Sequence, residues 1–342
     1  MNVVYLFRSP GTGHSIETVF GSIVAAQQQA GMSVTSVLLP HISRGLKSVW
    51  QNARFLHNLA RNSPPDTLFH VTGDVHYAVL MLPRSRTVLT IHDGSLLKKN
   101  GHRPLRYAFF WLLWYCLPVW WVVKLTVISE KTRQELIQYV GRVGRKAVVV
   151  PNGYDPAFFQ LPKLFCPNCP VLLQIGTAPN KNLHRLIAAV TGLPCTLVIV
   201  GPLTDELRNA LKNHRIDYQN HVDLKQPDLI SLYETCDIAT FVSTYEGFGM
   251  PVLEANAVGR VVIASDIQPL RDIAPDAAQF VDPTDVAAIR AGILRLIQDD
   301  AYRQTLINAG WNNAQRFTAA HTALRYRLLY RQMQSSPQPP VL

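Results

Sequence analysis

The chain has 342 residues, of which 48% are hydrophobic and 16% are charged, and its formal net charge is +10. This length predicts about two domains, and the apolar fraction excludes a disordered chain. The five cysteines are an odd number spread over a long chain, which excludes a disulfide scaffold.

The positive charge is confined to the first half of the chain. Residues 1–150 carry 17 Lys and Arg against 6 Asp and Glu, whereas residues 151–342 carry 16 against 17. A basic half favours nucleic acid, anionic lipid or a phosphorylated ligand as the partner. The alternative is that these residues only solvate the surface. The first half also holds five of the six Trp, which favours a binding role.

The N-terminal apolar run, residues 1–7, has no basic start and is too short for a signal peptide. The most apolar stretch, residues 107–123, is interrupted by Pro118 and is shorter than the ~20 residues of a spanning helix. We therefore expect a soluble, cytoplasmic protein with a membrane-facing surface.

Strand-like and helix-like segments alternate along the first half. Short apolar runs predict strands at 3–7, 33–39, 68–71, 86–91 and 125–129. Helical spacing predicts helices at 17–30, 48–61 and 103–123. Strands that alternate with helices form βαβ units, so a parallel sheet is expected.

The second half repeats this plan. Strands are expected at 171–175, 195–200, 238–242 and 261–265, and helices at 181–191, 206–214, 251–258, 285–299 and 301–317. The helix at 285 has a cap in Thr284 or Asp285.

These patterns predict an α/β protein with two Rossmann-like doubly wound domains that face a central cleft. The expected N-terminal domain covers 1–155 and the C-terminal domain 170–317, joined by a Pro-rich linker, 156–169. A C-terminal helix is expected over 318–334, and a return of this helix to the first domain is left open. Residues 335–342 are expected to be disordered. Ligands of such sheets bind beyond the carboxyl ends of the strands.

One loop carries the clearest chemical pattern. Residues 243–255, STYEGFGMPVLEA, follow a predicted strand and open a predicted helix. The two glycines allow a close approach of the backbone to a ligand, and the helix N-terminus attracts an anion. With Glu246 and Glu254 the loop suits a nucleotide sugar. The alternative is a Gly-rich turn with a helix-capping Glu.

This loop, in the form EGFGMPVLE, resembles the signature of family 4 retaining glycosyltransferases of the GT-B fold. Four further segments resemble that family in the same order: TIHD at 90–93, VISE at 127–130, PNGYD at 151–155, and GTAPNKNL at 176–183, which is one residue shorter than the family's phosphate loop. The matches run from about residue 90 to about residue 255, and the twin α/β layout extends the likeness to most of the chain.

The resemblance implies a nucleotide-sugar donor in the second domain, a saccharide or polyprenyl-linked acceptor mainly in the first, and retaining transfer with no cofactor and no metal. Glu254 should hold the donor ribose, and Glu246 should contact the donor sugar. Lys181 should neutralise the diphosphate. The remaining donor-binding residues implied are Gly176, Thr177, Gly201, Gly247, Phe248, Gly249, Gly11 and Gly13. His92 and Asp93 should lie near the sugar, and His14 on the acceptor side.

Two residues depart from the family pattern. Asn180 stands where many members have Arg, and Thr177 stands where some members place a phosphate-binding Arg. We therefore expect Lys181 as the single cation on the diphosphate. A carboxylate nucleophile and a front-face route both remain open, and we favour the front-face route, in which the departing phosphate helps deprotonate the acceptor.

The aromatic stretch of the first half is a further feature. Eight aromatic residues lie between 107 and 121, with basic residues before and after them. Trp and Tyr beside Lys and Arg suit a membrane interface, and burial in the fold or in a dimer contact is the alternative. The residues expected to face a membrane, on the inner side of the cytoplasmic membrane, are Lys98, Lys99, Arg103, Arg106, Trp111 and Trp114.

Other functions stay open as alternatives. A GT-B sugar-nucleotide epimerase or phosphorylase would share the fold but not the chemistry. A non-catalytic nucleotide or nucleic-acid binding module is disfavoured because no nucleic-acid motif is present, and we expect no nucleic-acid partner. The CxxC at 166–169 has no second ligand pair for zinc, so free thiols are expected there.

Overall fold

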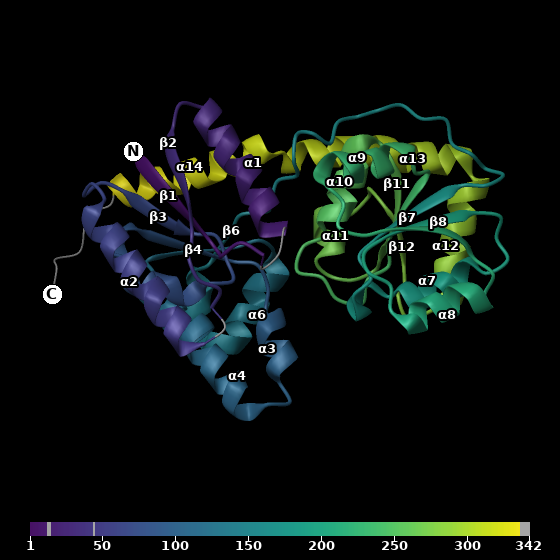
Figure 1. Ribbon diagram of the computed structural model, residues 1–342. Coiled ribbons are helices and arrows are strands. Elements are labelled where there is room, and N and C mark those ends of the chain that lie inside the picture. The colour runs from purple at the N-terminus through teal and green to yellow at the C-terminus, as the bar shows by residue number, and fades with distance from the viewer. Residues whose placement is uncertain (12–14, 44, 336–342) are drawn as a thin grey trace. The chain divides into compact units, whose positions relative to one another are not determined.

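The computed structural model describes residues 1–11, 15–43 and 45–335, and the chain divides into two compact units. Unit 1 comprises Met1–Gly153 and the C-terminal stretch from Ala319, and unit 2 comprises Tyr154–Thr318. Each unit is a six-stranded parallel sheet with helices on both faces (Figure 1). The predicted fold class of two doubly wound α/β domains is therefore confirmed.

The sheet of unit 1 has the strand order β2-β1-β3-β4-β5-β6. Its strands are β1 (Asn2–Phe7), β2 (Ser33–Leu38), β3 (Leu68–Val71), β4 (Thr87–Ile91), β5 (Lys124–Val127) and β6 (Val148–Val149). The central strands β3 and β4 are buried along their whole length, as expected for parallel strands covered on both faces. The order reverses between β1 and β3, which makes the loops after these two strands the expected ligand site of this unit.

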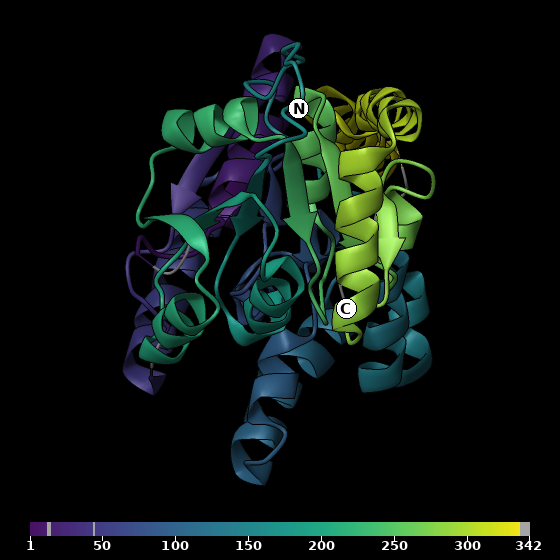
Figure 2. The same cartoon turned by 90° about the vertical axis from the view of Figure 1, so that its right-hand side faces the viewer.

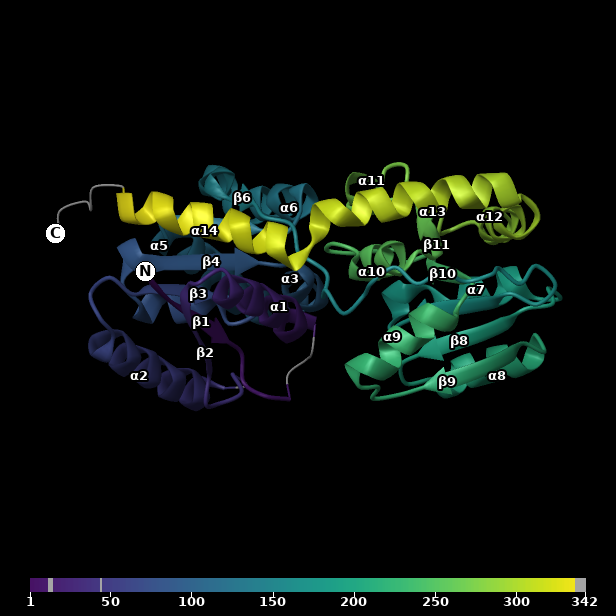
Figure 3. The same ribbon diagram turned by 90° about the horizontal axis from the view of Figure 1, so that it is seen from above.

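Helices cover both faces of this sheet. The helices are α1 (Ser15–Gln29), α2 (Leu46–Asn62), α3 (Ser95–Asn100), α4 (Pro104–Phe110), α5 (Leu117–Trp121), α6 (Glu130–Val140) and α14 (Ala319–Ser335). The yellow α14 lies beside α1 on one face, and α2, α4 and α6 lie on the other (Figures 1 and 3). The C-terminal helix thus belongs to unit 1.

A buried polar chain joins α14 to this sheet. The Tyr330 hydroxyl donates to the Tyr5 hydroxyl at 2.7 Å and therefore accepts from His70 Nδ1 at 2.6 Å. The other ring nitrogen of His70 lies 2.7 Å from the Thr90 hydroxyl. All four residues are fully buried, and burial lowers the pKa of His70 to about 3, so this histidine is neutral. Each of these four side chains has a hydrogen-bond partner, so this polar network holds α14 on the sheet without burying a charge.

The sheet of unit 2 has the order β12-β11-β10-β7-β8-β9. Its strands are β7 (Val171–Ile175), β8 (Thr196–Val200), β9 (Asp217–His221), β10 (Ile238–Phe241), β11 (Val261–Ser265) and β12 (Gln279–Val281). Numbered within the unit this is 3-2-1-4-5-6, the order of doubly wound dinucleotide-binding sheets, and the switch point lies between β7 and β10. The loops after β7 and β10 are therefore the expected ligand site.

The helices of unit 2 also form two layers. They are α7 (Leu183–Val190), α8 (Asp205–Asn213), α9 (Gln226–Thr235), α10 (Met250–Val258), α11 (Leu270–Ile273), α12 (Val286–Gln298) and α13 (Asp300–Ala314). Figure 2 shows the lime α12 alongside the strands of this unit. It packs on the face that carries α7, and α13 packs with α10 on the opposite face. Asp285 caps α12 by accepting from the N–H groups of Ala287 and Ala288.

The helix expected at 103–123 is broken into three parts: α4, a π-helical turn at Trp111–Cys116, and α5. Pro118 has no N–H to donate to the carbonyl of Trp114, four residues earlier. His76 Nδ1 donates to that carbonyl instead, at 2.7 Å. The proline and the buried histidine together explain where the helix changes its winding.

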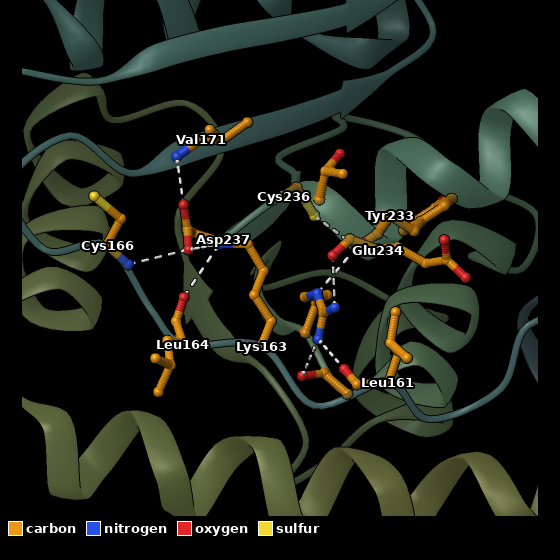
Figure 4. Close-up of polar contacts among 12 residues, drawn as sticks. Leu161, Lys163, Leu164, Cys166, Val171, Tyr233, Glu234, Cys236 and Asp237 are labelled. Carbon is orange, nitrogen blue, oxygen red and sulfur yellow. Dashed lines mark hydrogen bonds and ion pairs between the residues drawn. The ribbon is translucent and has the colours of Figure 1, made fainter.

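The segment predicted as a linker, 156–169, packs on unit 2 (Figure 4). The carboxylate of Asp237, 4% exposed, accepts from the backbone N–H groups of Cys166 and Val171 at 3.2 and 2.8 Å, and it pairs with Lys163. Arg260 donates to the carbonyl of Leu161 at 2.9 Å. Two buried charged groups thus fasten the irregular segment to the helices and sheet of this unit.

Candidate active site

The two loops at the switch point of unit 2 are joined to each other. Residues 176–182 follow β7, and residues 242–249 follow β10. The N–H of Thr244 donates to the Asn180 carbonyl at 2.8 Å, and the Asn180 side chain donates to the Tyr245 carbonyl at 3.0 Å. Asn180 therefore links the two loops. This residue, which departs from the family pattern, has a structural role here.

Lys181 and Glu246, predicted separately as phosphate and sugar ligands, form an ion pair. Their Nζ and Oε1 atoms are 2.7 Å apart, and the two side chains are 20% and 12% exposed. The ammonium also lies 4.7 Å from the centroid of the Phe241 ring. Gly176 has φ +88°, and a Cβ there would lie 3.1 Å from the carbons of Lys181. The glycine thus leaves room for the lysine stem to cross the loop.

The loop of residues 243–249 ends at the N-terminus of α10. Gly249 precedes the helix with φ +125°, and Pro251 stands in its first turn. The Phe248 ring is buried and meets Phe317 edge-on at 6.2 Å. Within the described residues, the N–H groups of Phe248 and Gly249 have no hydrogen-bond acceptor. Helix-terminal N–H groups of this kind bind anions.

Glu254, on α10, is the second carboxylate of this region. Its Oε2 accepts a hydrogen bond from the Tyr233 hydroxyl at 2.7 Å. Burial raises the pKa of Glu254 to about 7, and the attraction of Lys181 opposes that rise. Lys181 therefore acts electrostatically on both predicted carboxylates.

Thr177 and Gly201 lie on neighbouring loops. The Thr177 hydroxyl donates to the Pro202 carbonyl at 2.6 Å. Gly201 has φ +130°, and a Cβ there would lie 3.0 Å from the Thr177 hydroxyl oxygen. Because the hydroxyl has only one proton, Thr177 can offer a phosphate its backbone N–H but not its side chain while this bond persists.

A second group of polar residues lies at the switch point of unit 1. Arg8, directly after β1, donates to Glu17 through two bonds of 2.7 and 2.9 Å and pairs with Asp74, which lies just after β3. The sequence argument did not identify these three residues. The available signal was a charged residue placed immediately after a buried strand.

His92 and Asp93 follow β4 in the same unit. His92 Nε2 donates to the Thr72 carbonyl at 2.7 Å, which leaves Nδ1 as an acceptor. Burial lowers the pKa of His92, so the ring is neutral at pH 7. Asp93 Oδ1 accepts from the N–H of Ser95 at the start of α3, at 2.8 Å. A Cβ at Gly73 would lie 2.6 Å from the His92 ring, so this glycine makes room for the histidine.

Three predicted residues belong to the loop after β1. Gly11 has φ +77°, and no atom lies within 4 Å of a Cβ placed there. This open, left-handed position is consistent with an approach of a ligand to the backbone. Gly13 and His14 lie outside the described residues.

The predicted membrane-facing residues divide into two groups. Lys98, Lys99, Arg103 and Arg106 are exposed, and Lys98 pairs with Glu135 at 2.7 Å. The prediction for Trp114 is wrong: the side chain is 4% exposed in the core, and its indole N–H donates to the Asp74 carbonyl. The half-buried Trp111 donates to the Tyr139 carbonyl at 2.7 Å.

Other residues of this segment take the surface positions. Leu105 is 87% exposed, Trp120 68% and Leu112 42%. The walls of a cavity of about 430 Å³ include α4 and the start of α2. Its lining residues are Ser43, Gly45, Val49, Leu105, Arg106, Phe109, Phe110 and Trp114. None of the helices in the described part of the chain has the length and apolarity needed to cross a bilayer.

The described residues form no cluster of side chains that could bind a metal ion. Across residues 1–11, 15–43 and 45–335, no three His, Cys, Asp or Glu side chains lie close enough to hold an ion together. All five cysteines are free thiols: Cys166 and Cys169 are exposed, Cys116 is half-buried, and Cys195 and Cys236 are buried.

Comparison with known proteins follows the division into two units. The model of Glycosyltransferase Family 4 matches residues 4–158, and the model of Glycosyl transferases group 1 matches residues 165–312. The chain belongs to the family 4 glycosyltransferases. It is 33% identical over 175 residues to the O-antigen chain mannosyltransferase B of Escherichia coli, a match that covers 46% of this chain and 45% of that protein. The chain thus spans less than half the length of this relative.

Solved structures cover the chain almost completely. Sucrose-phosphate synthase from Thermosynechococcus elongatus superposes with a TM-score of 0.76 at 18% identity, over 98% of this chain and 100% of that one. HepE from Anabaena, solved in complex with UDP-glucose, gives a TM-score of 0.74 at 16% identity over 97% and 100%. These similarities confirm the predicted GT-B fold.

Proposed function

We propose that this family 4 glycosyltransferase moves a hexosyl group from a nucleotide sugar to a saccharide or polyprenyl-linked acceptor, with retention of configuration and without a bound metal. The observation that carries the proposal is the Lys181–Glu246 ion pair beside the N-terminus of α10. A cation and unpaired backbone N–H groups suit a diphosphate, and two carboxylates suit hydroxyl groups of a sugar and a ribose.

In this proposal each residue of unit 2 has one task. The diphosphate replaces Glu246 as the partner of Lys181 and is held by the N–H groups of Phe248 and Gly249. Glu246, released from the ion pair, accepts from hydroxyls of the donor sugar, and Glu254 accepts from the ribose diol. As the bond to the diphosphate breaks, Lys181 stabilises the charge of the leaving group. The departing phosphate oxygen takes the proton of the acceptor hydroxyl, which is the front-face route.

Unit 1 supplies the acceptor side of the proposal. The neutral His92 presents Nδ1 as a hydrogen-bond acceptor, and the Arg8–Asp74 pair fixes the loops around it. The named Escherichia coli relative is a mannosyltransferase of O-antigen synthesis. Mannose is therefore the first sugar to test, and a polysaccharide of the cell envelope is the first product to seek.

The test is a transfer and hydrolysis screen of the purified protein over UDP-, GDP- and ADP-hexoses. We expect Glu246→Ala to lower transfer by at least about 10²-fold, the size of effect seen when one transition-state contact is removed. Glu254→Ala should chiefly raise the KM for the donor. The matched control is Glu206→Ala, which removes an exposed carboxylate from the same unit. Full activity in Glu246→Ala, or no turnover of any nucleotide sugar, would overturn the proposal.

A peripheral membrane contact is the second part of the proposal. Residues 94–129 contain no Asp or Glu but carry five Lys and Arg. This segment exposes apolar side chains, including Leu105, Leu112 and Trp120, and it also exposes the cations Arg103 and Arg106. Apolar and cationic groups on one segment suit the surface of an anionic bilayer. The cavity behind α4 is lined mainly by apolar side chains, which supports an acceptor with a lipid part.

Vesicle binding tests this contact. Trp120→Ser should weaken binding to anionic vesicles at low salt by about 3- to 10-fold, because one interfacial Trp is lost. Trp50→Ser is the control, since Trp50 is 63% exposed in the same unit but lies on α2. Equal binding of both variants and the wild type, or no binding to anionic vesicles at all, would contradict the proposed docking.

A further inference from the structure

Tyr233, near the end of α9, lies beneath the Glu254 carboxylate. The residue has no exposed surface, and its hydroxyl donates to Glu254 Oε2 at 2.7 Å. No family motif considered above includes it. A fully buried tyrosine whose hydroxyl donates to a proposed ligand carboxylate does more than pack, because it selects one orientation of that carboxylate.

The hydroxyl is always the donor in this pair. Burial and the neighbouring Glu254 together raise the pKa of Tyr233 well above its usual value, so the phenol stays protonated. A phenol has one proton, and the carboxylate accepts it on Oε2. Oε1 and the remaining lone pair of Oε2 are then left in a fixed direction.

The tyrosine is itself held from several sides. Phe158 meets its ring edge-on at 5.4 Å. Arg260 donates from Nε to the Tyr233 carbonyl at 3.0 Å and from a second nitrogen to the Glu234 carbonyl at 2.7 Å. The same guanidinium reaches the Leu161 carbonyl at 2.9 Å. Arg260 thus joins the end of α9 to the segment that leads to β7, and Figure 4 shows Tyr233, Glu234 and Leu161 in this region.

We propose that Tyr233 is a positioning residue for nucleotide binding: it holds the Glu254 carboxylate in the rotamer that can accept both hydroxyls of the donor ribose. The inference rests on the proposed role of Glu254. A glutamate side chain has three rotatable bonds, and a bidentate contact to a diol needs one arrangement of them. Tyr233 removes that freedom before the donor arrives, and the Arg260 contacts keep the tyrosine in place.

The same contact makes nucleotide binding depend on pH. Three groups face Glu254: the Tyr233 hydroxyl from α9, Asp155 from the segment after β6, and Lys181 from the loop after β7. Tyr233 and Lys181 favour the carboxylate, and Asp155 disfavours it. Since the carboxylate form accepts from the diol, the affinity for the nucleotide should fall as the pH drops through about 7. Removal of the Tyr233 hydroxyl should raise the pKa of Glu254 and move this inflection to a higher pH.

The experiment is titration of UDP, GDP and ADP into the full chain, followed over pH 5.5–9, with steady-state kinetics of the donor that the wild type uses. Tyr233→Phe should raise the nucleotide Kd and the donor KM by roughly 10- to 20-fold at pH 7.5, the lower end of the range for a lost hydrogen bond to a charged group. The kcat should stay within about twofold, and the pH inflection should move upward. Tyr218→Phe, which alters a tyrosine 38% exposed on β9, is the matched control.

A double-mutant cycle with Glu254→Gln distinguishes the two levels of the argument. In the presence of Glu254→Gln, the further change Tyr233→Phe should have little effect, because the two side chains act together. If Glu254→Gln weakens the nucleotide but Tyr233→Phe leaves Kd and the inflection unchanged, the positioning role is wrong and the proposed function stands. If Glu254→Gln has no effect on Kd, both the ribose contact and the positioning role are wrong. A lower melting temperature with unchanged Kd in Tyr233→Phe also counts against the proposal.

Discussion

The Lys181–Glu246 ion pair shows how one contact serves two states of a site. Both side chains are largely shielded from water, so a lysine or glutamate there without a partner would lose solvation. In the structure each side chain neutralises the other. A bound donor offers phosphate oxygens to the lysine and hydroxyl groups to the glutamate, so both keep partners after the exchange. Neither change in partner leaves a charge buried alone.

Gly249 is the residue at which the loop geometry is most constrained. A Cβ at this position would lie 2.5 Å from Leu270 Cδ2 and 2.8 Å from Ile273 Cδ1, and its φ of +125° is unfavourable for other residues. We expect Gly249→Ala to lower the free energy of unfolding by about 2–4 kcal/mol, through combined overpacking and backbone strain. Urea denaturation measures this loss.

A matched glycine separates the two causes. Gly192 in the same unit has φ +72°, and no atom lies within 4 Å of a Cβ placed there. Gly192→Ala should therefore cost only about 1–2 kcal/mol, the backbone contribution alone. Equal losses in the two variants would mean that α11 moves aside without cost and that close packing does not fix the loop.

At the scale of elements, the sequence predicts what local patterns encode. The strands β7 and β11 were predicted with their observed ends, because each is a short, mainly apolar run, bounded by Pro170 and Gly176 in one case and by Arg260 and Asp266 in the other. The loop at 243–249 was predicted from its glycines and from Pro251 at a helix start. Short or partly polar elements such as α9 and β9 carry no such pattern, and they were missed.

Contacts between distant segments could not be predicted. Arg8 and Asp74 are 66 residues apart, and Tyr233 and Glu254 are joined only because α9 and α10 pack on one face of the sheet. The prediction that Trp114 of the aromatic segment faces a membrane was wrong for a related reason. The composition of this segment suited a surface, but which tryptophan faces inward depends on the π-helical turn before Pro118, and that turn rotates Trp114 into the core.

At the scale of the whole molecule, the chain leaves unit 1 at residue 153 and re-enters it at residue 319. A variant in α14 should therefore affect the two units differently. Ala323, 5% exposed, packs in unit 1, so Ala323→Asp should place a carboxylate in the core and lower the stability of that unit by about 3 kcal/mol or more. Binding of a nucleoside diphosphate by unit 2 should stay within about twofold of the wild type.

Calorimetry and nucleotide titration together check this expectation. Leu324→Asp is the control, because Leu324 is the next residue on α14 and is 40% exposed. If Ala323→Asp weakened nucleotide binding as strongly as it destabilised the protein, the two units would not be independent in folding.

The late return of α14 has a consequence for how the protein is made. A ribosome synthesises β1 to β6 first, and then the 165 residues of unit 2, before the helix that carries Tyr326 and Tyr330 emerges. At 5–20 residues per second, roughly 8–30 s pass in which Tyr5 and His70 lack their cover. Unit 2 is completed at the end of this interval, whereas unit 1 still lacks the helix that covers one face of its sheet. The first half of the chain is therefore the part that a chaperone must protect.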